Sequence, residues 1–331
     1  MGSVPGRSLE TYRGLATPSE GLARLGCPRF YRGVSSPRSP HFRRTTTRDL
    51  DLLSMGANLL SPIERAQIRL VRASLRPGLL DRTVRALQSN VGQRWIRAAT
   101  SPLLTIHGLD RLPAWDANGS ILCVCNHRSF FDLYAVTSEL VARGLPYRIL
   151  FPVRSSFFFD NPMGLLINGA MSFFAMYPPI FRDKRRAALN LASLDEMASL
   201  LRRGGFFVGI HPEGTRNLGG DPYTLLPAQT GVGRLVRKAR VPVIPVFVNG
   251  LCNDFVRQVV GGLRGDGDPI HIVFGAPVDF GPLIDEPDTP RTHRQIAESC
   301  RSAIARLGEE ERALRAAHAD QERPLGSVEG R

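Results

Sequence analysis

The sequence has no long apolar run. No stretch of about 18 consecutive apolar residues occurs, so no conventional membrane-spanning helix is expected. The nearest approach covers residues 163–181, which Asn168, Ser172 and two prolines interrupt. The N-terminus has no apolar core of the kind found in secretory signals, so we also expect no ordinary export signal.

Cysteine is scarce and scattered. The chain contains five cysteines, an odd number at irregular spacing, which argues against a disulfide framework and favours a reducing compartment. Cys123 and Cys125 have the spacing of a metal-binding pair, but they lie in an apolar run over residues 120–125 that predicts a buried strand. We therefore interpret them as small buried side chains. No other cluster of metal ligands is visible, and no metal is expected.

Lysine is almost absent, and the positive charge is unevenly distributed. Only two of the 43 basic residues are lysines, and the net charge is +13. Residues 1–50 carry nine arginines against three acidic residues, and residues 51–100 carry eight against three. Such a concentration favours an anionic partner, either a membrane surface or a nucleic acid, although a coding bias toward arginine would weaken this inference.

The two basic segments differ in pattern. Residues 1–50 have no hydrophobic periodicity and predict a disordered basic tail, with an organellar transit peptide as the alternative. Residues 51–100 predict an amphipathic helical segment, because Ser61-Pro62 is a typical helix start and Pro77-Gly78 a typical end. A second helix is expected to carry Leu80, Val84 and Leu87 on one face. The first helix bears a narrow basic stripe of Arg65, Arg69, Arg72 and Arg76, opposite Ile63, Ile68, Leu70, Val71 and Leu75.

Two interpretations of this segment remain open. A basic amphipathic helix is typical of an element that lies on a membrane surface. The alternative is a helix packed on the main domain, with its arginine face in solvent.

Strand-like and helix-like segments alternate from about residue 103 onward. Apolar strand-like runs cover 103–107, 121–125, 147–152, 205–210, 241–248 and 270–274, with helical patterns between them. This alternation predicts an α/β fold with a mixed, largely parallel sheet flanked by helices. We place the main domain at residues 101–288, a C-terminal helix at 289–318 and a tail at 319–331.

The first candidate site is Asn126-His-Arg-Ser-Phe-Phe-Asp132, directly after a predicted buried strand. Positions i and i+5 of a continuous helix do not face each other, so His127 must precede the helix. Asp132 can then lie in the first helical turn and reach back to the imidazole, which would act as a general base. Ser129-x-x-Asp132 also resembles a capping box, so a purely structural role is the alternative.

Three further segments follow. Residues 209–216 end in Glu213-Gly-Thr-Arg216, a loop that offers a carboxylate, a hydroxyl and a guanidinium suited to phosphate. Residues 179–186 form a basic cluster that includes Arg182. Residues 241–246 form an apolar strand with two prolines, which predicts an edge strand or an irregular strand end.

In this order and spacing the four segments resemble the glycerolipid acyltransferases of the 1-acylglycerol-3-phosphate acyltransferase family. Asn126, His127 and Asp132 match the family's NHxxxxD block, and Pro212-Glu-Gly-Thr-Arg216 matches FPEGTR. Residues 241–246 match VPIIPV, and residues 225–231 match LLPFKTG. The chain departs from the pattern in places: His211 replaces an aromatic ring, Gln229 replaces a lysine, and Arg182 is assigned by position.

The resemblance implies an O-acyltransferase that moves a fatty acyl group from acyl-CoA or acyl-carrier protein to the hydroxyl of a lysophospholipid. The expected acceptor is 1-acylglycerol 3-phosphate, which would give phosphatidic acid in phospholipid biosynthesis. His127 would be the base and Asp132 its partner, with backbone N–H groups near the helix start holding the oxyanion. The resemblance assigns the acceptor's headgroup to Arg182, Glu213, Gly214, Thr215 and Arg216.

The resemblance implies no cofactor, an anionic membrane surface as partner, and a peripheral location facing the cytoplasm. Gln229 leaves glycerol 3-phosphate or another lyso-lipid, such as a lyso-aminolipid, open as the acceptor. A catalytically silent protein that binds membranes or acyl-CoA is the alternative of another class. A nucleic-acid partner is not expected, because no recognised motif for one occurs.

Overall fold

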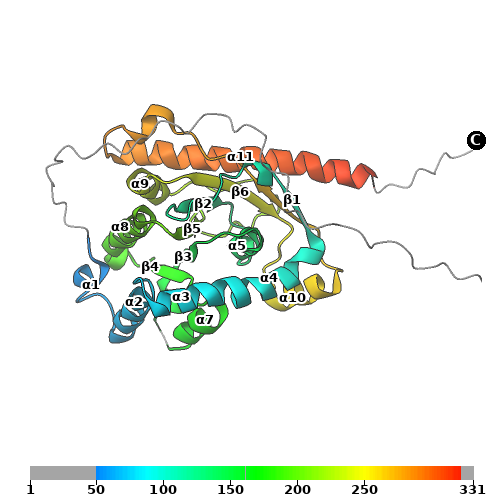
Figure 1. Ribbon diagram of the computed structural model, residues 1–331. Helices are drawn as coiled ribbons and strands as arrows, with labels where there is room; N and C mark the ends of the chain where they lie inside the picture. The colour runs from blue at the N-terminus through cyan, green and yellow to red at the C-terminus, as the bar shows by residue number, and fades with distance from the viewer. Residues whose placement is uncertain (1–49, 161, 322–331) are drawn as a thin grey trace, which may run out of the picture. The chain divides into compact units, whose positions relative to one another are not determined.

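A seven-stranded sheet lies at the centre of the molecule, with helices on both of its faces (Figure 1). The computed structural model describes residues 50–160 and 162–321, which fall within one compact unit. The architecture confirms the predicted α/β class with a mixed, largely parallel sheet. The tail predicted over residues 1–50 lies outside the described residues, except for its last position.

The strand order is β1-β7-β6-β2-β5-β3-β4. Neighbouring strands are parallel except for β6 and β7, which are antiparallel. The strands are β1 (Leu104–His107), β2 (Ile121–Cys125), β3 (Arg148–Arg154), β4 (Met176–Ile180), β5 (Phe206–Ile210), β6 (Val243–Asn249) and β7 (Ile270–Phe274).

The central strand β2 positions the first candidate segment. All five of its residues are buried, as expected of a parallel strand covered on both faces. Cys123 and Cys125 belong to this core, and burial raises the pKa of both thiols, so neither has the character of a thiolate ligand. Because β2 and β5 are parallel neighbours, the loops that follow them leave the sheet at the same edge.

The proline-bearing strand β6 is not an edge strand, so that part of the prediction was wrong. It lies between β2 and β7 in the interior of the sheet. Pro242 precedes its first residue, and Pro245 lies one residue before Val246, where the pairing with β7 stops at Phe274. The carbonyl of Pro245 accepts the N–H of Gly275, beyond that last pair. Pro245 has no N–H with which to return this bond to Gly275, so the antiparallel ladder ends at this proline.

The helices form two layers over the sheet. The long helix α11 (Pro290–Gln321) buries Ile296, Cys300, Ile304 and Leu307, as its periodicity predicted. It continues through Gln321, into the segment expected to be a tail, and residues 322–331 are outside the described part. The other helices near the sheet are α5 (Asp132–Ala142), α6 (Ser155–Phe158), α7 (Pro162–Ser172), α8 (Ala187–Arg203), α9 (Thr230–Ala239) and α10 (Phe255–Arg264).

The segment over residues 51–100 is helical, as predicted. It contains α1 (Leu52–Met55), α2 (Pro62–Ser74), α3 (Leu79–Leu87), the π-helix η1 (Gln88–Gly92) and α4 (Gln93–Thr100). A complete capping box of Ser61 and Glu64 starts α2. No helix among the residues described here is both long and apolar enough to cross a bilayer.

Helix α2 packs on the domain through Ile68, Val71 and Leu75. One arginine of its basic stripe, Arg72, forms ion pairs with Asp51 and with Glu196 on α8. The structure thus agrees with the packed-helix alternative for this face of α2.

Helix α3 differs from the expectation. It buries Val84, but Leu80 and Leu87 are exposed. The adjacent Gln88 is buried instead, because its side-chain amide bonds both backbone groups of Ile149 in β3.

Candidate active site

His127 and Asp132 meet at the carboxyl end of β2. As predicted, Asp132 is the first residue of α5 and His127 lies in the loop before it. The Nδ1 atom of His127 is 3.3 Å from Oδ2 of Asp132. The Asp132 side chain is fully buried, whereas the His127 side chain keeps 20% of its surface exposed. A carboxylate only accepts, so it assigns the proton to Nδ1 and leaves the Nε2 lone pair available.

The same oxygen of Asp132 also holds the loop before α5. Oδ2 accepts the backbone N–H groups of Arg128 and Ser129, each at 2.8 Å. The N–H of Phe131 is bonded to Ser129 Oγ at 3.2 Å. Asp132 therefore fixes the preceding loop and orients the histidine, while the capping box is only half formed, because α5 has no side-chain N-cap. The helix-start N–H groups of these three residues are thus already engaged, contrary to the expectation that N–H groups there would be free to hold an oxyanion.

The pKa shifts describe a base that is neutral at rest. Burial raises the pKa of Asp132 to about 6, although His211 and the two backbone N–H groups oppose this. Burial, with Arg216 and Arg182 nearby, lowers the pKa of His127 to about 4. At neutral pH the pair is therefore a neutral imidazole beside a carboxylate rather than an ion pair. This is the protonation state a general base requires.

His211, from the loop after β5, lies flat against His127. The ring centroids are 3.7 Å apart and the planes differ by 8°. Nδ1 of His211 lies 3.0 Å from the carbonyl oxygen of Cys125 and 2.9 Å from that of Asn126. Both partners only accept, so Nδ1 carries the proton and Nε2 does not. Burial and the neighbouring His127 lower the pKa of His211 to about 3, so this ring stays neutral.

This packing brings three possible metal ligands together, which the sequence did not reveal. His127, Asp132 and His211 offer ligand atoms within 4.8 Å of one another. An imidazole binds a metal in the plane of its ring, at about 2.0–2.1 Å for zinc. Two parallel stacked rings cannot both aim at one ion in this way. The hydrogen bonds of His211 to two carbonyl groups also oppose the rotation that binding would need.

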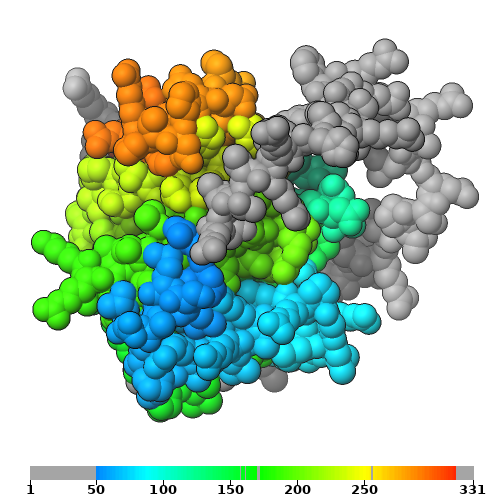
Figure 2. Space-filling view, turned by 90° about the vertical axis from the view of Figure 1, so that its left-hand side faces the viewer, coloured from blue at the N-terminus to red at the C-terminus, as the bar shows by residue number. Residues whose placement is uncertain are grey.

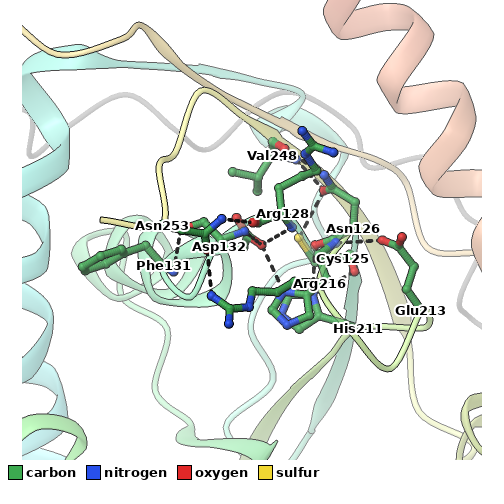
Figure 3. A network of polar contacts seen from close by, with 12 residues as sticks. Cys125, Asn126, Arg128, Phe131, Asp132, His211, Glu213, Arg216, Val248 and Asn253 are labelled. Carbon is green, nitrogen blue, oxygen red and sulfur yellow. Dashed lines mark hydrogen bonds and ion pairs between the residues drawn. The ribbon is translucent and has the colours of Figure 1, made fainter. Parts of the chain in front are cut away.

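Glu213 braces the two loops against each other. Its Oε1 accepts the backbone N–H of His127 and its Oε2 that of Leu226, both at 2.8 Å. The carbonyl of His127 in turn accepts the N–H of Asn217 at 2.8 Å. Burial raises the pKa of Glu213, while the two N–H groups act against that rise. Side chains of Asp132, His211 and Glu213 gather around the end of β2 (Figure 3).

Arginines surround the site without acidic partners. Arg182 donates to the carbonyl of Gly214 at 3.3 Å, and Arg216 to the side-chain oxygen of Asn253 at 2.9 Å. Neither arginine has a carboxylate within salt-bridge distance in the described ranges, and both are exposed. Gly214 adopts a φ of +66°, which suits glycine at this turn. A neutral contact leaves the positive charge of each guanidinium available to an anion.

A cavity of about 820 Å³ connects these groups. Its polar side holds His127, His211 and the loop of residues 213–216, together with Arg182. Its lining also includes apolar side chains, among them Leu133, Phe151 and Met176. A second, small cavity shares Phe130, Tyr134, Phe158 and Met176 with the first and is lined further by Trp95, Phe131, Ile167 and Ser172. The volume of the large cavity is within the range of small-molecule sites.

Sequence reasoning missed two contributors to this site. Arg154, at the end of β3, lines the large cavity and has no ion pair among residues 50–160 and 162–321. Nothing in the local sequence separates it from the many other arginines. Asn126 had been matched only by motif, yet its side-chain amide pairs with both backbone groups of Val248 in β6, at 2.8 Å each. That pair fastens the loop to the neighbouring strand.

The segment that contains the candidate site is similar to known proteins. The family model described as "Acyltransferase" matches residues 103–249. A Caenorhabditis elegans protein provisionally named 1-acyl-sn-glycerol-3-phosphate acyltransferase acl-2 is 23% identical over 207 residues, which cover 60% of this chain and 62% of that protein. The human 1-acyl-sn-glycerol-3-phosphate acyltransferase beta is 29% identical over 123 residues, 37% of this chain and 39% of that protein.

The alignments thus span 62% and 39% of the length of these two relatives. Among solved structures, the 1-acyl-sn-glycerophosphate acyltransferase PlsC from Thermotoga maritima is 18% identical with a TM-score of 0.47, covering 78% of this chain and 93% of that one. The family-model match includes both loops that meet at the ends of β2 and β5. Residues 103–249 therefore form a domain of the acyltransferase family, and through it the chain is similar to 1-acyl-sn-glycerol-3-phosphate acyltransferases.

Proposed function

We propose that this protein transfers a fatty acyl group from an acyl thioester, acyl-CoA or acyl-carrier protein, to the hydroxyl of a lysophospholipid. The first acceptor to consider is 1-acylglycerol 3-phosphate, with phosphatidic acid as the product. The named activity of the relatives supports this acceptor. We place the reaction at a membrane surface on the cytoplasmic side, with no cofactor.

One observation carries the proposal: an available imidazole nitrogen lines a cavity whose walls also hold arginines and apolar side chains. His127 lines the cavity near Arg182 and Arg216, and apolar side chains such as Leu133 line the same cavity. A lysophospholipid has the same division, because its phosphate is anionic and its chain apolar. The hydroxyl to be acylated lies between these two parts of the lipid, and the proposed base lines the same cavity.

The chemistry follows from the protonation states. Nε2 of His127 takes the proton of the acceptor hydroxyl as the oxygen attacks the thioester carbonyl. The tetrahedral intermediate then expels the thiolate as the C–S bond breaks, and the imidazolium returns the proton to sulfur. Asp132 stabilises the transient imidazolium through Nδ1. General-base assistance is typically worth about 10²–10⁴-fold, with positioning of the substrates adding to it.

We assign the remaining groups as follows. Arg154, Arg182 and Arg216 attract the acceptor's phosphate, and Thr215 offers its hydroxyl at the same wall. The backbone N–H groups of Thr215 and Arg216 form no hydrogen bond within the described part of the chain, so they are candidates for the oxyanion.

We assign a different role to Glu213. Because its two oxygens are engaged by backbone N–H groups, we assign it to holding His127 in place, instead of the expected direct contact with the headgroup. Gly214 supplies the turn that this loop needs.

The acceptor is the least constrained part of the proposal. Gln229 lines the cavity where the resemblance expects a lysine, so one positive charge is missing from this wall. Glycerol 3-phosphate and lyso-aminolipids are therefore the second candidates. A catalytically silent role is disfavoured, because the His127–Asp132 pair is held in a productive geometry.

Product analysis tests the proposal directly. The purified chain is incubated with acyl-CoA, or separately with acyl-carrier protein, and a mixed pool of lyso-lipids and glycerol 3-phosphate, and the products are identified by mass spectrometry. We expect phosphatidic acid above all other products, and its loss in His127→Ala with an unchanged melting temperature. Absence of any acylated product would refute the proposal. Full activity in folded His127→Ala would remove His127 as the base.

A further inference from the structure

A third loop adjoins the two motif loops, which follow β2 and β5. It comprises residues 250–254 between β6 and α10, and we name it the β6–α10 loop. Because β6 is a parallel neighbour of β2, this loop leaves the sheet at the same edge as the loop that carries His127. Ser129 Oγ donates to the carbonyl of Cys252 at 2.8 Å, which joins the two loops directly. The β6–α10 loop lies beyond residues 103–249, which the family model matches.

The β6–α10 loop is held at both of its ends. Gly250, at its start, has a φ of +95°, and a side chain there would collide with the carbonyl of Pro269. At the other end, the side chain of Asp254 caps α10 by accepting the N–H of Arg257 at 2.9 Å. The backbone that carries Asn253 is therefore fixed on both sides.

Asn253 uses both ends of its side-chain amide. Its Nδ2 donates to the carbonyl of Arg128 at 2.9 Å, and its Oδ1 accepts a hydrogen bond from Nη1 of Arg216, also at 2.9 Å. Arg128 directly follows His127, and Arg216 belongs to the second motif loop. Figure 3 draws both contacts. One amide therefore links the loop of the proposed base to an arginine assigned to the acceptor's phosphate.

Arg216 lies close enough to His127 for its charge to act on the imidazole. Burial is the main reason why the pKa of His127 falls to about 4, and the guanidinium of Arg216 is the next. Both residues line the large cavity. Because the amide of Asn253 is neutral, it orients this guanidinium without compensating its charge. The contact leaves the other N–H groups of the guanidinium to an anion.

A guanidinium that is already oriented binds an anion more tightly than a freely rotating one. An arginine side chain has many rotamers, and fixing it on binding costs conformational entropy. A contact that orients it before phosphate arrives removes part of that cost. Asn253 and Arg216 are both exposed, so their contact does not serve to fill the core. Its effect is on the position of the charge.

We propose that Asn253 is a positioning residue, which holds Arg216 toward the acceptor's phosphate at a fixed place relative to the loop of His127. This role rests on the proposed function, because that function assigns Arg216 to the phosphate. Asn253 then strengthens the binding of a phosphate-bearing acceptor and leaves the binding of the same lipid without phosphate unchanged. It is thus a determinant of acceptor specificity that lies outside the four motif segments.

Lipid binding without an acyl donor tests this role, because it needs no turnover. Isothermal titration calorimetry of the full chain compares 1-hexanoylglycerol 3-phosphate with 1-hexanoylglycerol, which lacks the phosphate. The variants are Asn253→Ala, Asn253→Asp, Arg216→Gln and Asn253→Ala/Arg216→Gln. The matched control is Asn90→Ala, an exposed asparagine of η1 whose amide also donates to a backbone carbonyl at 2.9 Å. Asn90 belongs to the helical segment of residues 50–100, which Figure 2 shows in blue and cyan across the lower part of the view.

Each variant has an expected effect. Asn253→Ala should weaken the binding of the phosphate-bearing lipid about three- to tenfold and leave that of 1-hexanoylglycerol unchanged. Because the effect passes through Arg216, the double variant should bind no more weakly than Arg216→Gln alone. Asn253→Asp keeps the size of the side chain but places a carboxylate against Arg216, so it should weaken phosphate binding more than alanine does, and less so in high salt. Asn90→Ala should bind both lipids as wild type does.

Three results would overturn the positioning role. They are unchanged binding of the phosphate-bearing lipid by both Asn253 variants, losses that multiply in the double variant, or an equal loss on 1-hexanoylglycerol, which would indicate general support of the loops. Melting temperatures of the variants show that each is folded.

Acylation kinetics, measured in parallel, separate the two proposals. In an active enzyme Asn253→Ala should raise KM for the phosphate-bearing acceptor at nearly constant kcat. A phosphate-specific loss of binding in Asn253→Ala, while wild type acylates no acceptor, would refute the proposed function alone. Acylation by wild type with binding and KM insensitive to Asn253 would refute the positioning role alone. Failure of wild type to bind the phosphate-bearing lipid would overturn both.

Discussion

Replacing Asp132 by asparagine should lower activity strongly without destabilising the fold. The asparagine side chain would keep the size of the original group and its acceptor toward the N–H groups of Arg128 and Ser129. It would remove the negative charge that supports the His127 imidazolium. Because that charge acts only while the proton is on the imidazole, we expect kcat/KM to fall by roughly 10³–10⁴-fold.

The stability effect has the opposite sign. The pKa of Asp132 rises from 3.8 to about 6 on folding, which corresponds to about 3 kcal/mol. Since the folded pKa is the higher one, the contribution of Asp132 to stability is fully present below pH 3.8 and lost as the pH rises through about 6. At neutral pH the ionised group is therefore unfavourable, and asparagine removes that penalty.

An amide group brings a cost of its own. The buried Oδ1 of Asp132 has no hydrogen-bond partner, so the amide nitrogen placed there would be unsatisfied. That costs about 1–3 kcal/mol, which offsets most of the gain. We expect the free energy of unfolding of Asp132→Asn at pH 7.5 to lie between the wild-type value and about 2 kcal/mol above it.

Urea unfolding and acylation kinetics over a pH series measure both effects, with Asp266→Asn, an exposed site, as the control. Wild-type activity should fall as the pH drops through about 6, where Asp132 takes up its proton, and the variant should lack that limb. A variant that unfolds several kcal/mol more easily would show that the carboxylate is a stabilising ion-pair partner. That result, or undiminished activity, would refute the reasoning.

Three other changes test the neighbouring groups. Glu213→Gln leaves one of two backbone N–H groups facing an amide nitrogen, so urea unfolding should show a loss of about 1–3 kcal/mol; a wild-type curve would contradict the bracing role. His211→Phe keeps the ring stack but loses both carbonyl contacts, so it should retain more activity than His211→Ala and leave the acid limb of the pH profile in place. A moved limb would instead make His211 part of the titrating group. Arg182→Gln and Arg216→Gln should each raise KM for a phosphate-bearing acceptor about tenfold at nearly constant kcat, whereas Arg306→Gln should not; a fall in kcat alone would reject phosphate binding.

The spacing of residues along the chain was sufficient to predict the part of the site that lies on one short segment. The five-residue separation of His127 and Asp132 places one before a helix and the other in its first turn, and the structure has this arrangement. The burial of β2 could also be predicted from the sequence, because a strand covered on both faces has an unbroken apolar sequence. These features depend on near neighbours in the chain.

Features that depend on distant packing were not predictable from one sequence. The apolar positions Leu80 and Leu87 are exposed because Gln88 is committed to the backbone of β3, a contact between residues 61 positions apart. The segment of residues 163–181 contains both α7 and β4, which composition alone did not separate. Arg154 joins the site only because β3 ends at the cavity. Tertiary packing decides each of these.

The strongest structural link in the site joins the two motif loops, and it explains why their residues occur together. His127 is held by its N–H to Glu213 and by its carbonyl to Asn217, both from the loop after β5. His211 of that loop holds the two carbonyl groups that precede His127. The proposed base is thus fixed through its own backbone by a segment about 86 positions away. A change in either loop would move the imidazole relative to the arginines around the cavity. The two motifs therefore act as one structural unit, and the position of the proposed base depends on both loops.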